Sequence, residues 1–178
     1  MTVDPTGRLE RIAGRLTLFV TRTFKAPIDD VWAAITEPER VARWLGTWTG
    51  DPSTGTVMFA MTFEGQEPPG DAMEIRECHP PRRLAVTSQV GEQRWYLDVD
   101  LSEADGVTTL AFSQPDVDPE DSLSVGPGWE FYLDRLVAAE TGGDLATIDF
   151  ERDYYPAMAD HYREQRDRAS GGALGRPT

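Results

Sequence analysis

The chain has 178 residues, of which 39% are hydrophobic and 10% aromatic. A chain of this length suits one domain, and such a domain buries roughly 70% of the surface that its unfolded form exposes. The net charge of -14 at pH 7 excludes the basic surface with which proteins bind nucleic acids or anionic membranes.

A strand pair is predicted at the start of the chain. Residues 9–12 and 15–24 flank Ala13-Gly14, which suits the turn of a hairpin. Within 15–24 the side chains alternate between an apolar face and a mixed face, as in a half-buried strand. The sequence therefore predicts that this part of the chain joins a sheet.

Two short helices are predicted over residues 27–45. Thr36 and Glu39 have the spacing of a capping box, so a second helix is expected to open at Thr36. We predict that Trp32 and Trp44 have structural roles rather than contacting a ligand. The apolar positions at helical spacing are Ile28, Val31, Trp32 and Ile35 in the first helix, and Val41, Trp44 and Leu45 in the second.

Further strands are predicted between residues 56 and 114, whereas residues 47–55 are rich in turn formers. Asp105-Gly106 lies between two apolar runs and is a strong hairpin signal. Consecutive strands that are joined by short turns pair antiparallel, so we expect an antiparallel sheet of six or seven strands. The predicted strand ranges are 56–64, 72–79, 84–90, 94–101 and 107–114.

The C-terminal part of the chain predicts a long helix followed by an extra segment. Pro127 is expected to open the helix and Gly142-Gly143 to end it. Residues 144–168 carry large apolar side chains and are expected to form a helical extension that docks, with Phe131 in its seat, on the domain or on a second copy in a homodimer. The predicted division is therefore a domain over 1–143, an extension over 144–168 and a disordered tail over 169–178.

Four stretches of sequence carry a family resemblance. They read PIDDVWAAITEPERVARW at residues 27–44, HPPRRL at 79–84, QRWYL at 93–97 and GWEFYLDRL at 128–136. In this order they resemble the START-like (SRPBCC) superfamily, and within it the homologues of the activator of the ninety-kilodalton heat-shock protein ATPase. The resemblance implies an α+β helix-grip fold, in which a curved antiparallel sheet surrounds a long C-terminal helix and encloses a cavity.

Few side chains in the sequence are suited to catalysis or metal binding. With two histidines and one cysteine in the chain, we predict no catalytic residue, no metal site and no cofactor. Cys78 and His79 are neighbours in a predicted strand, so they point to opposite faces and are badly placed to share a proton. The lone cysteine and the lack of an apolar leader or membrane-length run predict a cytoplasmic protein.

The favoured function is a small-molecule binding protein whose cavity holds a hydrophobic or aromatic ligand, although the same side chains could simply fill the space. Ser88 is the predicted polar anchor because it shares a face with Val86 and Val90. A polar side chain within a strand needs a partner, water or ligand, if it faces the cavity; the candidates are Thr87, Ser88, Gln89, Arg94 and Gln114. A polyketide cyclase- or dehydratase-like enzyme, as among some START-like relatives, and a chaperone-associated interaction domain are the alternatives. The predicted ligand contacts are Phe59, Met61, Met73, Ile75, Ser88, Trp95, Leu97, Trp129, Leu133 and Leu136.

Overall fold

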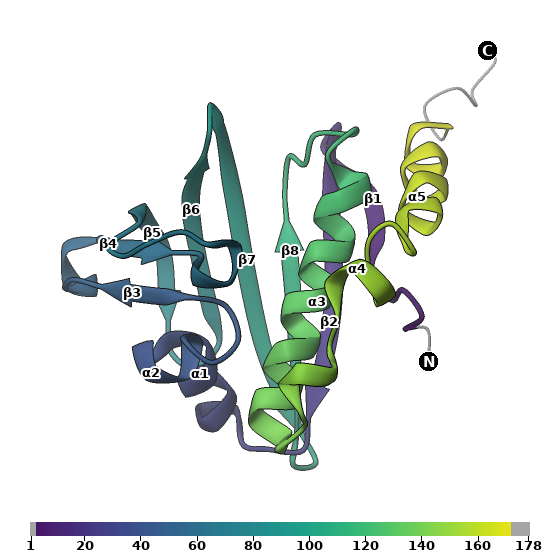
Figure 1. Cartoon of the computed structure of the whole chain (residues 1–178). Helices are drawn as coiled ribbons and strands as arrows, with labels where there is room; N and C mark the ends of the chain where they lie inside the picture. The colour runs from purple at the N-terminus through teal and green to yellow at the C-terminus, as the bar shows by residue number, and fades with distance from the viewer. Residues whose placement is uncertain (1–2, 172–178) are drawn as a thin grey trace.

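The computed structural model describes residues 3–171, which form an eight-stranded antiparallel sheet with a long helix lying across it (Figure 1). The predicted α+β helix-grip class is confirmed. The strands are β1 (Arg8–Ile12), β2 (Arg15–Phe24), β3 (Thr47–Thr49), β4 (Thr56–Ala60), β5 (Asp71–His79), β6 (Arg83–Val90), β7 (Gln93–Ala104) and β8 (Val107–Gln114), in the spatial order β1-β2-β8-β7-β6-β5-β4-β3. The helices are α1 (Ile28–Thr36), α2 (Pro38–Val41), α3 (Ser122–Thr141), α4 (Phe150–Asp153) and α5 (Ala159–Gly171), with 3-10 turns η1 (Pro52–Thr54), η2 (Thr62–Glu64) and η3 (Leu145–Thr147). None of the described helices is long and apolar enough to cross a membrane.

The sheet has one strand more than the seven that the sequence predicts at most. The additional strand, β3, lies in the stretch that was expected to be a turn region, and it pairs antiparallel with β4. Three residues are too few to show the alternation by which longer strands are found. Trp48 of β3 donates its indole N–H to the carbonyl of Thr36 over 3.0 Å, which ties this edge of the sheet to α1.

The two short helices follow the first long strand, as predicted, but the second does not open at Thr36. The Thr36 hydroxyl donates to the carbonyl of Trp32 over 2.7 Å, inside α1. Glu37 occupies the cap position of α2, with no hydrogen bond from a side chain there, and Pro38 is the first helical residue. The capping box with Glu39 is therefore not formed, because the proline fixes where the second helix starts.

Helix α3 begins at Ser122, upstream of the predicted start at Pro127. The Asp118 carboxylate accepts hydrogen bonds from two backbone N–H groups of the turn before the helix, which organises the chain for an earlier start. Pro127 is consequently inside the helix, where it has no N–H to donate to the carbonyl of Leu123. The predicted end is confirmed, since Gly142 takes a left-handed φ of 75°.

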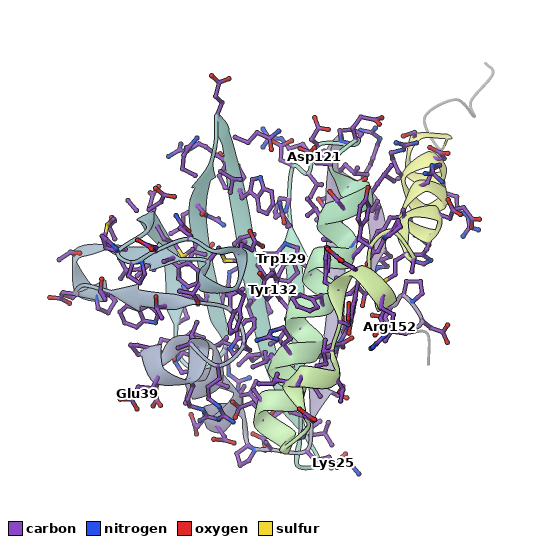
Figure 2. All side chains as sticks on the ribbon, viewed as in Figure 1. Lys25, Glu39, Asp121, Trp129, Tyr132 and Arg152 are labelled. Carbon is purple, nitrogen blue, oxygen red and sulfur yellow. The ribbon has the colours of Figure 1, made fainter. Side chains whose placement is uncertain are left out.

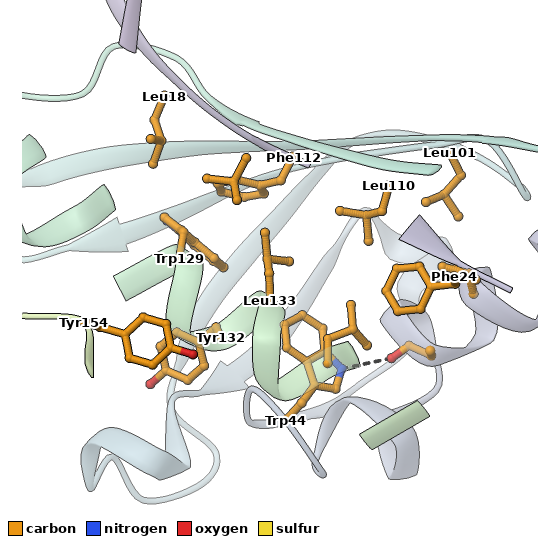
Figure 3. Close-up of a cluster of buried hydrophobic side chains, with 14 of the residues drawn as sticks. Leu18, Phe24, Trp44, Leu101, Leu110, Phe112, Trp129, Tyr132, Leu133 and Tyr154 are labelled. Atoms are coloured by element: carbon orange, nitrogen blue, oxygen red, sulfur yellow. Dashed lines mark hydrogen bonds between the residues drawn. The ribbon is translucent and has the colours of Figure 1, made fainter. Parts of the chain in front are cut away.

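The hydrophobic core lies between α3 and the central strands of the sheet. Leu18 of β2 and Leu110 of β8 are fully buried opposite Leu133 of α3 (Figure 3). The ring centroids of Phe112 and Trp129 are 4.3 Å apart. This packing fixes which residues of α3 face the sheet and so positions the site described below.

The residues that follow α3 pack against the rest of the protein. Phe131 contacts the rings of Phe150 and Tyr154, with centroids 5.4 and 5.5 Å apart. Helix α5 lies against β1 and α3 (Figure 1). It ends at Gly171, so residues 169–171 are helical rather than disordered as predicted, and the rest of the predicted tail, 172–178, lies outside the described residues. The division into domain, extension and tail stays a prediction.

A buried carboxylate joins the two ends of the chain. The side chain of Glu130 on α3 has 0% exposure and accepts hydrogen bonds from the backbone N–H groups of Thr6 and Gly7, both over 2.6 Å. It also accepts from the Tyr162 hydroxyl at 2.8 Å and from the Arg22 guanidinium at 2.7 Å. Burial raises the pKa of Glu130, but these hydrogen bonds outweigh burial and hold the pKa below its ordinary value.

Two glycines of α3 offer a matched test of how α5 is seated. A Cβ on Gly126 would lie 2.4 Å from the ring of Tyr162, whereas a Cβ on Gly128 would meet nothing within 4 Å. We expect Gly126→Ala to lower the free energy of unfolding by about 1–3 kcal/mol through overpacking. Gly128→Ala should raise it by up to about 1 kcal/mol through helix propensity. Urea denaturation measures both changes, and equal effects would contradict the packing described here.

Candidate functional site

An apolar cavity of about 300 Å³ lies between the sheet, the α1–α2 region and α3. Strands β3 to β8 supply one wall, and α3 contributes Trp129 and Leu133. The helical wall is made by Trp32, Ile35, Thr36, Val41, Trp44 and Leu45. The cavity is therefore closed more by the two short helices than by the long one, whereas the sequence predicted a cavity under the long helix.

Part of the predicted contact set lines this cavity, because the expected strand faces do point inward. Alternate residues of β5 and a helical i, i+4 pair on α3 meet across the space. The predicted contacts that line the cavity are Phe59, Met73, Ile75, Leu97, Trp129 and Leu133.

Four predicted contacts lie outside the lining of the cavity. Leu136 has 0% exposure and is packed in the core. Met61 follows the last residue of β4, where the chain turns into η2, and it lines a neighbouring groove instead. Ser88 of β6 pairs with Trp95 of β7, two residues along the strands from the pair Val86 and Leu97. Val86 and Leu97 line the cavity, whereas Ser88 and Trp95 do not. The structure thus gives no support to Ser88 as an anchor in this cavity.

Trp32 and Trp44 line the cavity, although the sequence interpretation gave them structural roles only. The helical pattern identified their apolar face but not what that face would meet. Trp44 has both roles, because it is also nearly buried and donates its indole N–H to the carbonyl of Ala34 over 3.0 Å (Figure 3). The residue four positions after Ala34 is Pro38, which has no N–H, so the indole supplies the hydrogen bond that the helix cannot.

The indole N–H groups of three wall tryptophans, Trp44, Trp48 and Trp129, are bonded to protein rather than presented to the cavity. The indole N–H of Trp48 donates to the Thr36 carbonyl, and that of Trp129 donates to Gln114 Oε1 over 2.7 Å. The Thr36 hydroxyl is bonded within its own helix. These tryptophans therefore offer mainly ring carbon to a molecule in the cavity.

Cys78 is exposed at the wall of the cavity, on the same side as Ile75. The register of β5 and β6 shifts between Ile75 and Glu77, and this bulge reverses the alternation of the strand. Among the described residues that line the cavity, Cys78 is the only one with a thiol, carboxyl, imidazole or amino group. Its neighbour His79 is not part of the lining.

A second groove, of about 390 Å³, lies between the η2 turn and α3, next to the cavity. Trp129 lines both spaces. Tyr132 donates its hydroxyl to Glu64 over 3.0 Å, and its pKa lies above the ordinary value, first because it is buried and then because of the Glu64 charge. Phe63 covers the guanidinium of Arg135, 4.0 Å from its ring centroid. These contacts hold η2 on α3.

The chain matches a family model and several solved structures. The family model described as "Activator of Hsp90 ATPase homolog 1-like protein" matches residues 25–140. CalU16 from Micromonospora echinospora, solved by NMR, is 24% identical with a TM-score of 0.63, over 99% of this chain and 100% of that one. EF2215 from Enterococcus faecalis is 20% identical with a TM-score of 0.69, over 92% of this chain and 91% of that one.

A third structure is similar over a shorter length. DynU16, from the dynemicin biosynthetic locus, is 24% identical with a TM-score of 0.55, over 71% of this chain and 48% of that one. A comparison with curated protein sequences gave no match. At these identities the solved structures show a shared fold.

Proposed function

The chain belongs to the Activator of Hsp90 ATPase homolog 1-like family, and from that premise and its cavity we propose that it binds a small hydrophobic or aromatic molecule without transforming it. The observation that carries the proposal is the apolar space of about 300 Å³, in whose wall the indole N–H groups of Trp44, Trp48 and Trp129 are bonded to protein. Such a volume is at the lower end of the range for ligand pockets, which favours a small ligand of two or three rings. Transfer of its apolar surface out of water would drive binding.

The chemistry of the cavity wall favours binding over catalysis. A cyclase- or dehydratase-like reaction needs a proton donor or acceptor within reach of the substrate. Among the described lining residues, Cys78 alone carries a thiol, carboxyl or imidazole group, and the hydroxyl of Tyr132 with its partner Glu64 lies in the adjoining groove. The experiments described below distinguish the enzymatic and chaperone-associated functions from binding alone.

A cytoplasmic location and a homodimer stay predictions.

Filling the cavity should abolish binding. Val86 lines the cavity and Ser88, two residues along β6, does not. With 4-ethylbiphenyl as a probe, at a hundredfold excess over its dissociation constant, we expect about 2.7 kcal/mol of stabilisation by linkage. Val86→Phe should remove this stabilisation, because the added ring occupies the space of the probe, whereas Ser88→Phe should keep it. Thermal denaturation with and without probe measures both.

Three results would change the proposed function. An unchanged melting temperature with 4-ethylbiphenyl and with other two- and three-ring aromatic probes would count against a binding site. Conversion of a bound polyketide-like compound, followed by mass spectrometry, would support the cyclase- or dehydratase-like enzyme. Stimulation of the ATPase of a ninety-kilodalton heat-shock protein by the purified chain would support the chaperone-associated domain.

A further inference from the structure

A polar cleft of about 330 Å³ continues the inner face of the sheet beyond the apolar cavity. On β8, Leu110 and Phe112 line the cavity, and the next residue on that face, Gln114, lines the cleft. On β7, Leu97 lines the cavity and Trp95 lines the cleft. Residues two apart on a strand are separated by about 6.6 Å, so cavity and cleft are successive parts of one surface.

Gln114 is a buried amide at the boundary between the two spaces. Its side chain is only 2% exposed, and its Oε1 accepts the indole N–H of Trp129. Because an indole nitrogen only donates, this bond fixes the orientation of the amide and leaves Nε2 as the free end. Within residues 3–171 no hydrogen-bond acceptor meets Nε2, although Gln114 lines the cleft. Nε2 is thus the end of the amide left for the cleft that Gln114 lines, where a ligand oxygen can accept its hydrogen bond.

The charges around the cleft restrict what that ligand oxygen can belong to. The lining includes Asp116, Asp118 and Asp121, with Arg94 as the cation in the same lining. Asp121 already accepts a hydrogen bond from Gln93 over 3.1 Å. Ionised carboxylates offer only acceptors and repel an anion. The cleft therefore suits a neutral group with an acceptor oxygen and disfavours a carboxylate or phosphate.

We propose that this cleft is the polar end of the ligand site, and that Gln114 Nε2 donates a hydrogen bond to a neutral carbonyl or hydroxyl oxygen of the ligand. The inference rests on the proposed function, and it names the ligand class as an elongated, neutral aromatic molecule with an oxygen at one end. In Figure 2, Asp121 lies at the start of α3 and Trp129 about two turns along it, so the helix passes from cleft to cavity. Gln114 takes the anchoring role that the sequence interpretation gave to Ser88.

Three probes with one ring skeleton test the inference: 4-ethylbiphenyl, 4-acetylbiphenyl and biphenyl-4-carboxylate. Calorimetry on the full chain should show the ketone binding about fivefold tighter than the hydrocarbon, as one added hydrogen bond allows, and the carboxylate binding more weakly than the ketone. In Gln114→Met this preference should disappear, so that the ketone and the hydrocarbon bind with about equal affinity. In the matched control Gln89→Met, which changes an exposed glutamine of β6 outside the lining of the cleft, the preference should be retained.

A second measurement keeps the inference falsifiable if Gln114→Met fails to fold. In the NMR spectrum of the wild type, the side-chain amide signals of Gln114 should shift with the ketone and not with the hydrocarbon. If the hydrocarbon binds but the ketone preference survives in Gln114→Met, or the Gln114 amide signals stay unchanged with the ketone, the inference is overturned while the proposed function stands. If none of the three probes binds, the proposed function fails and the inference fails with it.

Discussion

Replacing Glu130 with Gln should lower the free energy of unfolding by about 3–5 kcal/mol, because it removes one partner of a buried ion pair. The change keeps the size of the side chain but leaves Arg22 beside a neutral amide. It also turns one acceptor oxygen into a donor among the donors of Thr6, Gly7 and Tyr162. Urea denaturation at pH 7 measures the loss.

A neighbouring carboxylate provides the control for that change. Asp134 pairs with the same Arg22 over 2.8 Å, but its side chain is 25% exposed. We therefore expect Asp134→Asn to cost about 1 kcal/mol, as for an ordinary hydrogen bond. If Glu130→Gln and Asp134→Asn lowered the free energy of unfolding by similar amounts, the burial of Glu130 would not increase its contribution to stability.

The stability that Glu130 contributes should depend on pH with a definite sign. Its pKa in the folded protein is lowered, so its contribution is present above the pKa of an unfolded glutamate, about 4.3. As the pH falls through the lowered pKa, the carboxylate becomes protonated in both states and the contribution disappears. The difference in unfolding free energy between wild type and Glu130→Gln should accordingly narrow in acid, and a constant difference from pH 7 to pH 3 would contradict this.

Local sequence patterns predicted most of the helices and strands. They failed where the same local signal is compatible with two different structures. Alternation and the Asp105-Gly106 turn identified the long strands, and Gly142 marked the end of α3. Pro127 was read as a helix start because proline is favoured there, yet its helix is organised upstream by Asp118. The strand β3 was missed because its place is set by its pairing with β4, which lies outside any local pattern.

The site could be predicted only in part, because its walls come from distant segments. The alternation of side chains along the strand predicted that Met73 and Ile75 face the cavity, and they do. The bulge after Ile75, which the alternation could not predict, places Cys78 on the same side. No spacing rule joins Thr6 to Glu130, which are 124 residues apart in the sequence. Such contacts depend on the tertiary arrangement of the sheet and α3, so a local sequence pattern cannot predict them.

Trp44→Ala should lower the free energy of unfolding by about 3–5 kcal/mol, the range for removing a large buried aromatic side chain. Trp44 is 5% exposed, and its loss would also leave the Ala34 carbonyl without the donor that Pro38 cannot supply. Trp48 is a matched control, since it lines the same cavity and donates to the Thr36 carbonyl but is only half-buried on an edge strand. We expect Trp48→Ala to cost less than half as much.

A further variant separates the two contributions of Trp44. Trp44→Phe keeps most of the ring packing and removes the indole N–H, so it should cost about 1–3 kcal/mol for the carbonyl left unpaired. If Trp44→Phe were as stable as the wild type, water would have to reach Ala34, and the α1–α2 wall would be more open than the structure shows. If Trp44→Ala were as stable as Trp48→Ala, Trp44 would be a wall of the cavity alone, and the sequence interpretation of it as structural would be wrong.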